Sequence, residues 1–170
     1  MGLYLDCILV AQDDTEESNS TLVTEFFSGV VVIATDMEFD ECWELVEEHP
    51  NLLGVASDDL VSCFCGSVLQ AEVGTAFGNW LTTRRVSQPA IEFTVVENTG
   101  YGAFSVFEHG VKIREWDSDG ENVLGELLPE EQEYESQPVS RTLSVASRVL
   151  GCSFLRYRWE NLRFNVWKID

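Results

Sequence analysis

Cysteine and histidine are the residue types in this chain that could bind a metal ion. Cys63 and Cys65 stand two residues apart, so both thiols would point to the same side of a strand. A closed zinc site needs four ligands, and the remaining candidates, His49, His109 and three more cysteines, are scattered along the chain. We therefore expect no metal site and interpret Cys63 and Cys65 as buried structural thiols.

Nucleophilic catalysis would need a Cys or Ser beside a His that an acid orients. His49 precedes Pro50 at the expected end of a helix, and His109 precedes Gly110 in an expected turn. Neither position offers a rigid, dry pocket. The phosphate-binding patterns GxGxxG and GxxxxGK[ST] do not occur. The sequence therefore predicts that the chain is not an enzyme and uses no cofactor.

Two short acidic clusters carry the residue types of a calcium site. They are residues 13–17 (DDTEE) and residues 117–120 (DSDG). The second lacks the third acid and the distal Glu of an EF-hand loop, and the first has no Gly to turn it. We expect neither cluster to be a dedicated calcium site.

The densest group of acids is the segment 36–48, DMEFDECWELVEE, which contains no Lys or Arg. Its apolar residues Phe39, Cys42, Trp43 and Val46 follow the i, i+3, i+4, i+7 spacing of one helical stripe. Thr35 or Asp36 could cap such a helix. Each like-charge i,i+4 pair, such as Asp40 with Glu44, costs ~0.2–0.5 kcal/mol. We expect a helix over 36–48 that burial of the apolar stripe stabilises while its acids face solvent.

The charge of the whole chain is strongly one-sided. Among its 170 residues, 30 acids oppose 10 bases, for a net charge of −20. Residues 1–83 hold 16 of the acids and no base, whereas residues 84–170 hold 14 acids and all 10 bases. Such a field repels nucleic acid and anionic membranes and attracts basic surfaces. A salt-loving host is an alternative explanation, although its acids would be spread over the whole chain.

These observations predict a surface that binds a basic protein partner. The residues expected to form it are acids of the base-free half: Asp36, Asp40, Glu41, Glu44, Glu47, Glu48, Asp13, Asp14, Glu16 and Glu17. In the second half, three arginines alternate with aromatic residues between 156 and 164, a pattern that can bind single-stranded nucleic acid. With so negative a net charge, we expect these arginines to pair with the chain's own acids, and we expect no nucleic-acid partner.

The pattern of apolar and turn-forming residues predicts the elements that carry these side chains. Apolar runs predict strands over 3–11, 29–35 and 60–66, and helical patterns cover 20–28 and, more weakly, 67–82. From Pro89 onward, short β-rich runs separated by turn residues predict an antiparallel meander, with 108–110 as a tight hairpin connection. A charged connector (129–138), a helix ended by Gly151 and a closing strand (162–169) follow.

This order of elements favours one α+β domain over residues 1–170. We expect a mainly antiparallel sheet with helices packed on one face, and an acidic lobe (1–85) and a β-rich lobe (86–170) as its possible subdivision. The five cysteines are odd in number and have apolar neighbours, which suits a reducing compartment. The chain shows neither a signal peptide nor an apolar run of ~20 residues that could cross a membrane. We therefore expect a cytoplasmic protein without a membrane partner.

One stretch of the β-rich half resembles known proteins. Residues 100–131, GYGAFSVFEHGVKIREWDSDGENVLGELLPEE, resemble a segment of small bacterial proteins that are similar to immunity proteins of polymorphic and contact-dependent toxin systems. The residues that carry the resemblance are Phe104, Phe107, Gly110, Arg114, Trp116, Gly125, Glu126, Leu128, Pro129 and Glu130. The resemblance implies an inhibitor of a cognate toxin and implies no catalytic residues.

We therefore expect an acidic binding protein that neutralises a basic partner, with toxin immunity as its most specific form. A phage-type inhibitor or DNA mimic that acts on a host nucleic-acid-binding protein is the first alternative, because it uses the same electrostatics. A small ligand-binding domain or enzyme is the second, and a pocket with convergent polar groups on the antiparallel sheet would favour it.

Overall fold

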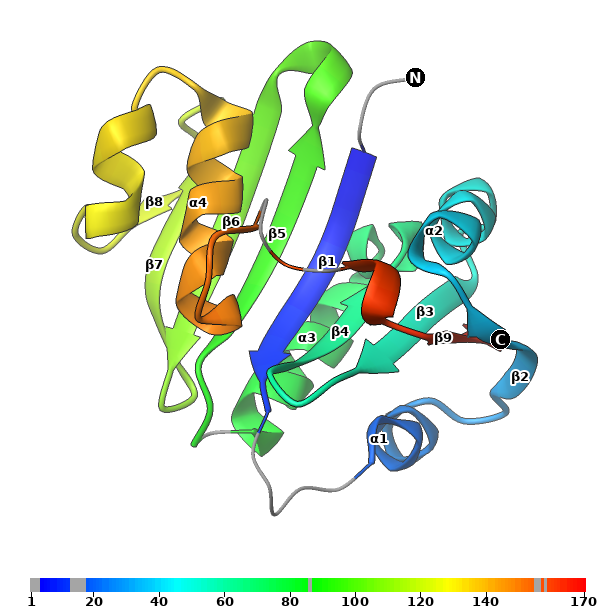
Figure 1. Cartoon of the computed structure of the whole chain (residues 1–170). Coiled ribbons are helices and arrows are strands. Elements are labelled where there is room, and N and C mark those ends of the chain that lie inside the picture. The colour runs from blue at the N-terminus through cyan, green and yellow to red at the C-terminus, as the bar shows by residue number, and fades with distance from the viewer. Residues whose placement is uncertain (1–3, 13–17, 86, 155–156, 158) are drawn as a thin grey trace.

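The centre of the molecule is a nine-stranded sheet, seen in a computed structural model that describes residues 4–12, 18–85, 87–154, 157 and 159–170 (Figure 1). Its strands follow the order β2-β9-β3-β4-β1-β5-β6-β7-β8, and every neighbouring pair is antiparallel. The predicted α+β class and antiparallel sheet are thus confirmed.

The strands and helices have the following bounds in the described residues. The strands are β1 (Tyr4–Ala11), β2 (Val31–Met37), β3 (Leu52–Ser57), β4 (Val61–Cys65), β5 (Ala90–Val96), β6 (Tyr101–Glu108), β7 (Val111–Asp117), β8 (Val123–Leu124) and β9 (Phe164–Lys168). The α-helices are α1 (Asn19–Phe26), α2 (Phe39–Glu48), α3 (Glu72–Arg84) and α4 (Pro138–Leu150). Short 3-10 helices are η1 (Ser67–Gln70), η2 (Glu97–Thr99), η3 (Pro129–Tyr134) and η5 (Trp159–Asn161).

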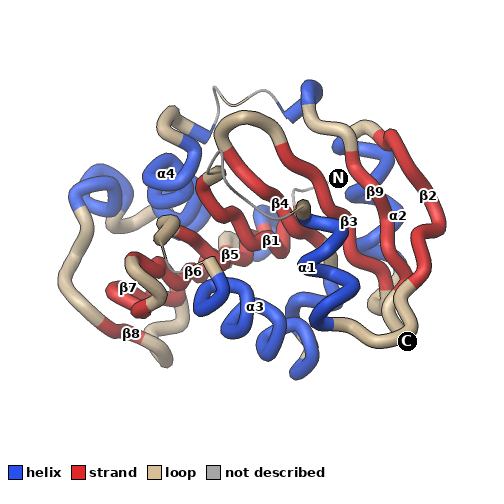
Figure 2. The backbone as a smooth tube through the Cα atoms, turned by 90° about the horizontal axis from the view of Figure 1, so that it is seen from below, coloured by secondary structure: helices blue, strands red, loops and turns tan. Residues whose placement is uncertain are grey.

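Helices cover both faces of the sheet, with α2 and α4 on one side and α1 and α3 on the other (Figure 2). The expectation of helices on one face was wrong. The reason is visible in β1, where Cys7 and Leu9 enter one hydrophobic core while Ile8 and Val10 enter the other. A central strand that is apolar on both sides needs cover on both sides.

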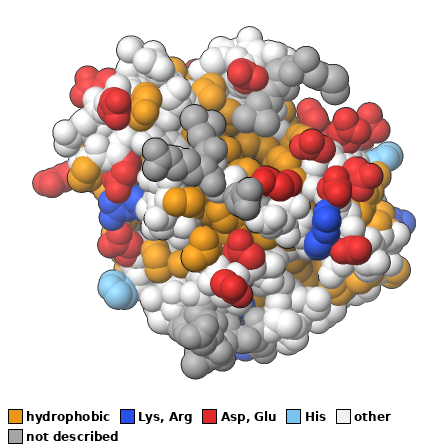
Figure 3. All heavy atoms as spheres, in the orientation of Figure 1, with side chains coloured by type: hydrophobic (Ala, Val, Ile, Leu, Met, Phe, Trp, Pro, Cys, Tyr) orange, Lys and Arg blue, Asp and Glu red, His pale blue; other side chains and the backbone are white. Residues whose placement is uncertain are grey.

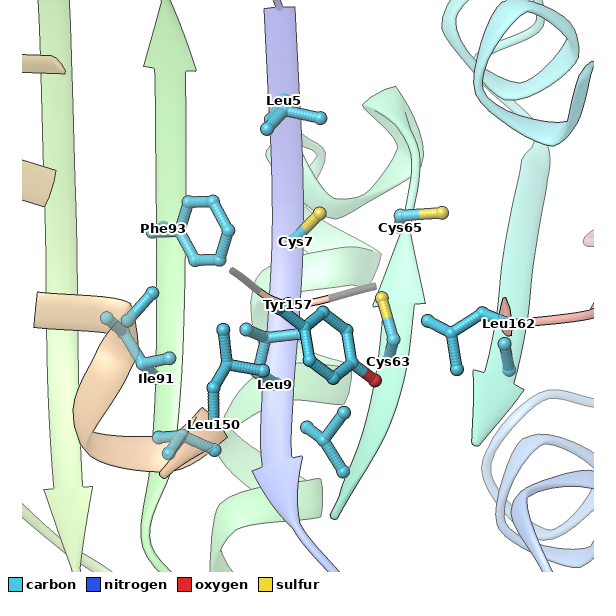
Figure 4. Close-up of a cluster of buried hydrophobic side chains, with 14 of the residues drawn as sticks. Leu5, Cys7, Leu9, Cys63, Cys65, Ile91, Phe93, Leu150, Tyr157 and Leu162 are labelled. Carbon is cyan, nitrogen blue, oxygen red and sulfur yellow. The ribbon is translucent and has the colours of Figure 1, made fainter. Parts of the chain in front are cut away.

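The core beneath α2 and α4 contains four cysteines. Cys7, Cys63 and Cys65 point into it from β1 and β4 among leucines, Ile91, Phe93 and Tyr157 (Figure 4), and Cys42 joins them from α2. Burial raises the pKa of the Cys7 thiol, which keeps it in its protonated form. In the part of the chain that the structure describes, no three His, Cys, Asp or Glu side chains are grouped so as to hold a metal ion. The predicted burial of Cys63 and Cys65 is confirmed.

Two features of the sheet were not expected from the sequence. Residues 52–57 form β3, although no strand was predicted there. The predicted closing strand exists as β9, but it lies between β2 and β3 and pairs with both. The last strand of the β-rich half is therefore inserted into the acidic half of the sheet.

The predicted hairpin and helix end are both present. β6 and β7 pair around His109 and Gly110, whose φ angles of 52° and 71° are left-handed. A two-residue hairpin loop in which both residues are left-handed is a type I′ turn, and the twist of this turn matches the twist of the two strands that it joins. Helix α4 ends at Gly151, which has a φ of 67°.

The connector after β8 is more than a charged loop, because it forms η3 and buries an ion-pair network. Glu131 is 0% exposed and accepts hydrogen bonds from Arg114 at 2.9 Å and from Arg141 at 2.6 Å. The Arg141 guanidinium lies 4.2 Å from the centre of the Trp116 ring. Although burial opposes it, the Arg114 guanidinium and its neighbours hold the pKa of Glu131 below its usual value. The network joins β7, η3 and α4.

Within the segment 100–131, Arg114 also holds together two neighbouring stretches of backbone. Besides its bond to Glu131, the Arg114 side chain donates to the carbonyl oxygens of Leu124 and Gly125 at 3.0 and 3.2 Å. Arg114 therefore links β7 to β8 at the edge of the sheet.

None of the helices in the described part of the chain combines the length and apolar character needed to cross a bilayer.

Candidate functional site

The predicted acidic helix is present as α2, which begins at Phe39 rather than at residue 36. Asp36 and Met37 complete β2, and Glu38 is the N-cap residue in place of the predicted Thr35 or Asp36. The Glu38 backbone N–H donates to Glu41 Oε2 at 3.4 Å, which helps to close the first turn.

The apolar stripe of α2 holds the helix against the sheet. Cys42 and Val46 are fully buried and Trp43 is 8% exposed, as predicted, while Phe39 is only half-buried. The Phe39 ring lies 5.0 Å from Trp159 and 5.9 Å from Phe164, centroid to centroid. Burial of such side chains contributes ~1.5–3 kcal/mol each, which outweighs the repulsion between the acids.

The opposite face of α2 presents its acids to solvent, and carboxylates gather where this helix reaches the surface (Figure 3). All five acids of the helix proper are exposed: Asp40, Glu41, Glu44, Glu47 and Glu48. Within the described residues, none of the five forms an ion pair with a Lys, Arg or His. The prediction that the helical acids point outward is confirmed.

Asp36 differs from these five acids. Its carboxylate lies 3.8 Å from the Arg163 guanidinium, which also lies 3.3 Å from Glu38. Arg163 reaches them because β9, which follows it, pairs with β2. All three side chains are well exposed, so these contacts add little stability. The other four predicted binding residues, Asp13, Asp14, Glu16 and Glu17, lie outside the described residues.

A second acidic feature, not predicted from the sequence, is a cavity of about 210 Å³ on the face of the sheet that carries α3. β1, β5, β6 and β7 supply its floor, while η1 and the first turns of α3 supply a wall. Four carboxyl groups line it: Asp6, Glu92, Glu115 and Asp117.

Asp6 is the most deeply buried of these acids, at 1% exposure. Its Oδ1 accepts hydrogen bonds from Gln70 Nε2 at 2.6 Å and from the Thr94 hydroxyl at 2.8 Å. Its Oδ2 is also buried and has no hydrogen-bond partner. Burial raises the pKa of Asp6, and hydrogen bonding of its carboxylate to the Tyr4, Thr94 and Gln70 side chains opposes that rise.

Glu92 lies diagonally across from Asp6, because Asp6 pairs with Thr94 and Ile8 pairs with Glu92. Its Oε1 is buried without a hydrogen-bond partner. That oxygen packs on the α3 backbone at Gly78, where any side chain would collide with it. Burial raises the pKa of Glu92 to about 7; Lys112 counteracts the rise and Glu115 adds to it.

The other two carboxylates are already engaged. Glu115 Oε1 accepts from Lys112 Nζ at 2.8 Å and from the Ser105 hydroxyl at 3.3 Å. Asp117 accepts from the backbone N–H groups of Glu121 and Asn122 at 3.1 and 2.7 Å, so it organises its own turn. The calcium-like sequence around Asp117 is thus a turn in which the carboxylate is used locally.

Sequence patterns did contain a signal for this cavity. Asp6 interrupts the apolar run LYLDCILVA, and a carboxyl group inside a buried strand needs a polar surrounding. The two histidines lie elsewhere: His49 follows α2 and His109 occupies the β6–β7 turn, and both are exposed.

The chain thus carries two acidic features on opposite faces of one sheet, an exposed helix and a partly buried cavity. Comparison with known proteins finds no match for it among family models, curated proteins or solved structures.

Proposed function

We propose that the chain binds a basic protein partner through the solvent face of α2. The observation that carries this proposal is the set of five exposed carboxylates on one ordered helix, none of which forms an ion pair within the described residues. Like charges at this spacing cost folding free energy, so their retention is best explained by a partner that supplies the bases.

The electrostatics of α2 suit rapid capture of such a partner. A field of one sign raises association rates about 10–10³-fold over uncharged encounter. Because the acids sit on a helix that is packed against the sheet, docking would order their side chains but little additional backbone, which limits the entropy cost.

In its most specific form, the proposal is a cytoplasmic immunity protein that inhibits a cognate toxin. A nuclease toxin, whose substrate site must be positive to hold phosphates, is a suitable target for an array of carboxylates. The segment 100–131 that resembles immunity proteins forms β6, β7, β8 and the start of η3, at the end of the sheet remote from β2. This segment would serve as the scaffold, while α2 would provide the contact to the toxin.

A pair of matched charge-reversal variants tests the proposal. The first replaces Asp40, Glu44 and Glu48 by Lys. The control replaces Glu126, Glu133 and Glu135 by Lys, which are equally exposed acids of the other half and give the same change in net charge. Glu131 is unsuitable for the control because it is buried between two arginines.

Wild type and both variants are used as bait in lysates of bacteria that carry candidate toxin genes, and retained proteins are identified by mass spectrometry. We expect a basic protein that binds wild type and the control but not the α2 variant. Association rates with that protein should fall for the α2 variant at low salt, and the difference should shrink as salt rises. Equal losses in both variants would show that net charge alone acts, and equal binding by both would remove α2 from the interface.

A further inference from the structure

The sheet ends on one side at β2 (Figure 2), and the first three residues of this edge strand are apolar and exposed. Val31, Val32 and Ile33 expose 58%, 39% and 48% of their surfaces, and we call them the β2 patch. A run of three exposed apolar residues favours aggregation, so a natural sequence that keeps one usually uses it for binding. Edge strands are commonly protected by Lys or Pro, and residues 31–34 (VVIA) contain neither. The β2 patch is therefore a candidate contact surface.

The acidic helix lies on the same face of the sheet as part of this patch. α2 follows β2 directly and leads into β3, and both Val31 of β2 and Leu52 of β3 pair with Lys168. The helix therefore runs back across the sheet from the end of β2 toward the level of Val31. Val32 pairs with Trp167, which belongs to the core beneath α1 and α3, so strand alternation turns the two neighbours of Val32 toward the α2 face. The β2 patch and the acids of α2 thus share this face.

Carboxylates dominate the charge beside the β2 patch. Residues 36–48 contain seven acids and no base, and the acids of α2 point to solvent. Among the described residues, Arg163 contacts Asp36 and Glu38, and the exposed Lys168 stands opposite Val31. The acids outnumber these bases, so the patch has a mainly negative border. An apolar centre within a polar border is the usual anatomy of a protein–protein interface.

We propose that the β2 patch is the apolar centre of the partner surface, and that the basic partner covers it with apolar side chains bordered by Lys and Arg. This inference rests on the proposed function, because it adds an apolar contact to the acids of α2. Charge complementarity selects this occupant, since the partner's bases meet α2 when its apolar side chains cover the patch. A second copy of the chain would instead bring together two molecules of net charge −20.

The backbone of β2 indicates contact through side chains rather than addition of a further strand. Its pairing with β9 shifts register between Val32 and Ala34 and again between Ala34 and Met37, and Asp36 has a φ of 58°. Bulges of this kind bend a strand and interrupt its hydrogen-bonding ladder, which protects the edge against pairing. The partner therefore needs apolar side chains that pack on the patch, and it does not need a free strand.

The patch and the acids should have separable effects on binding. Exposed charges steer association and lose this effect in salt, whereas close packing of apolar side chains slows dissociation. Burial of apolar surface depends little on moderate salt. A contribution of the β2 patch is therefore recognised as a gain in affinity that stays the same while the electrostatic attraction is screened.

The test compares two synthetic peptides of equal charge, Lys-Lys-Ile-Lys-Val-Lys-Lys amide and Lys-Lys-Ser-Lys-Thr-Lys-Lys amide. Each is titrated into the ¹⁵N-labelled full chain at 20 and 300 mM NaCl, and the backbone amide signals of Val31 and Ile33 give the affinity. We expect the apolar peptide to bind about tenfold more tightly or better, because it buries the patch. Salt should weaken both peptides and leave their ratio unchanged.

The outcomes separate this inference from the proposed function. Equal affinities of the two peptides for wild type would overturn the role of the β2 patch and leave the acidic surface as proposed. Failure of both peptides to bind at 20 mM NaCl would contradict the acidic surface itself, and the role of the patch with it.

Variants locate the apolar contact. Val31→Thr combined with Ile33→Thr keeps the β-branched shape of both side chains and should abolish the preference for the apolar peptide. The control combines Val111→Thr with Val123→Thr, whose side chains are 63% and 62% exposed near the opposite edge of the sheet, and it should keep the preference. A preference that persists in the β2 variant, or disappears in both variants, would overturn the proposal.

Sedimentation velocity tests the second copy as the alternative occupant. We expect wild type and the β2 variant to be monomers at the same concentrations. A wild-type dimer that the β2 variant converts to a monomer would assign the patch to self-association and overturn the proposal.

Discussion

At the scale of single residues, Glu92 should make the stability of the protein depend on pH. Its pKa in the folded state is about 7, against an ordinary value of 4.5, because burial disfavours its charged form. The folded chain therefore binds this proton more tightly, so stability falls as pH rises from about 4.5 to 7.

Glu92→Gln should remove this loss. We expect the variant to exceed wild type in free energy of unfolding above pH 7 by up to about 3 kcal/mol, with little difference below pH 4.5. Urea denaturation between pH 4 and 8 measures both quantities. A difference that is the same at every pH would show that Glu92 is not the titrating group.

Glu131 should be far more important for stability than its neighbour Glu130. Glu131→Gln leaves Arg114 and Arg141 buried without a counter-charge, and breaking a buried ion pair costs about 3–5 kcal/mol. Glu130 pairs with Arg148 at 3.1 Å where both side chains are 26% exposed, so Glu130→Gln should cost about 1 kcal/mol or less. Chemical denaturation of the two variants compares them directly, and similar losses would contradict the importance given to the buried network.

The outward acids of α2 were predictable from spacing, but the buried acids were not. A helical period decides which side of a helix faces solvent, so Glu44 and Glu48 could be placed from local sequence alone. Glu131 was assigned to a charged connector because its arginine partners come from β7 and α4. Burial of a charge depends on such distant partners, which the spacing along the chain does not reveal.

At the scale of elements, α2 should become more stable when one central acid is reversed. Glu44 has Asp40 and Glu48 four residues away and Glu41 and Glu47 three residues away on the helix surface. Glu44→Lys converts these repulsions into attractions, and we expect a gain of about 1 kcal/mol in the free energy of unfolding.

This gain should be present at 20 mM NaCl and mostly lost at 1 M NaCl, because salt screens exposed charges. Urea denaturation at both salt concentrations measures it. A loss of stability, or a gain that salt does not change, would mean that the acids of α2 do not repel one another as their spacing indicates.

Several elements were predictable because their signals are local. The apolar stripe of α2, the left-handed residues of the β6–β7 turn and Gly151 at the end of α4 each act within a few residues. β3 was missed because its run LLGVAS is short and contains Gly54, which weakens a strand pattern. In the fold, Gly54 is required, since an added Cβ would lie 2.5 Å from Cys42 Sγ and 2.8 Å from Cys65 Sγ.

At the scale of the whole molecule, the net charge of −20 should make stability increase with salt. Self-repulsion of a one-sided charge destabilises the compact state, and ions screen it. We expect the melting temperature to rise between 10 and 300 mM NaCl, and to rise less for the Asp40, Glu44 and Glu48 to Lys variant. Differential scanning calorimetry checks this, with sucrose as the uncharged control, and a flat salt response would show that the charges are already compensated.

The class of the fold was predictable from its order of elements, but its topology was not. A run of short strands with turn residues indicates antiparallel pairing between sequence neighbours. The pairing of β9 with β2 and β3 joins residues from the two ends of the chain, and no local pattern distinguishes it from pairing at the edge of the meander. The cavity has the same origin, since it lies where Asp6 of β1 and Glu92 of β5 meet.

The position of β9 also has a consequence for how the protein is made. Val31 of β2 pairs with Lys168, and among the described strands β9 is the one neighbour of β2, so β2 joins the sheet only after β9 has been made. The aromatic contacts of α2 with Trp159 and Phe164 wait for the same residues. Contacts this distant in sequence slow folding, because a long loop must close before they form. The docking of the acidic helix is therefore completed only after residues 159–168 have been made.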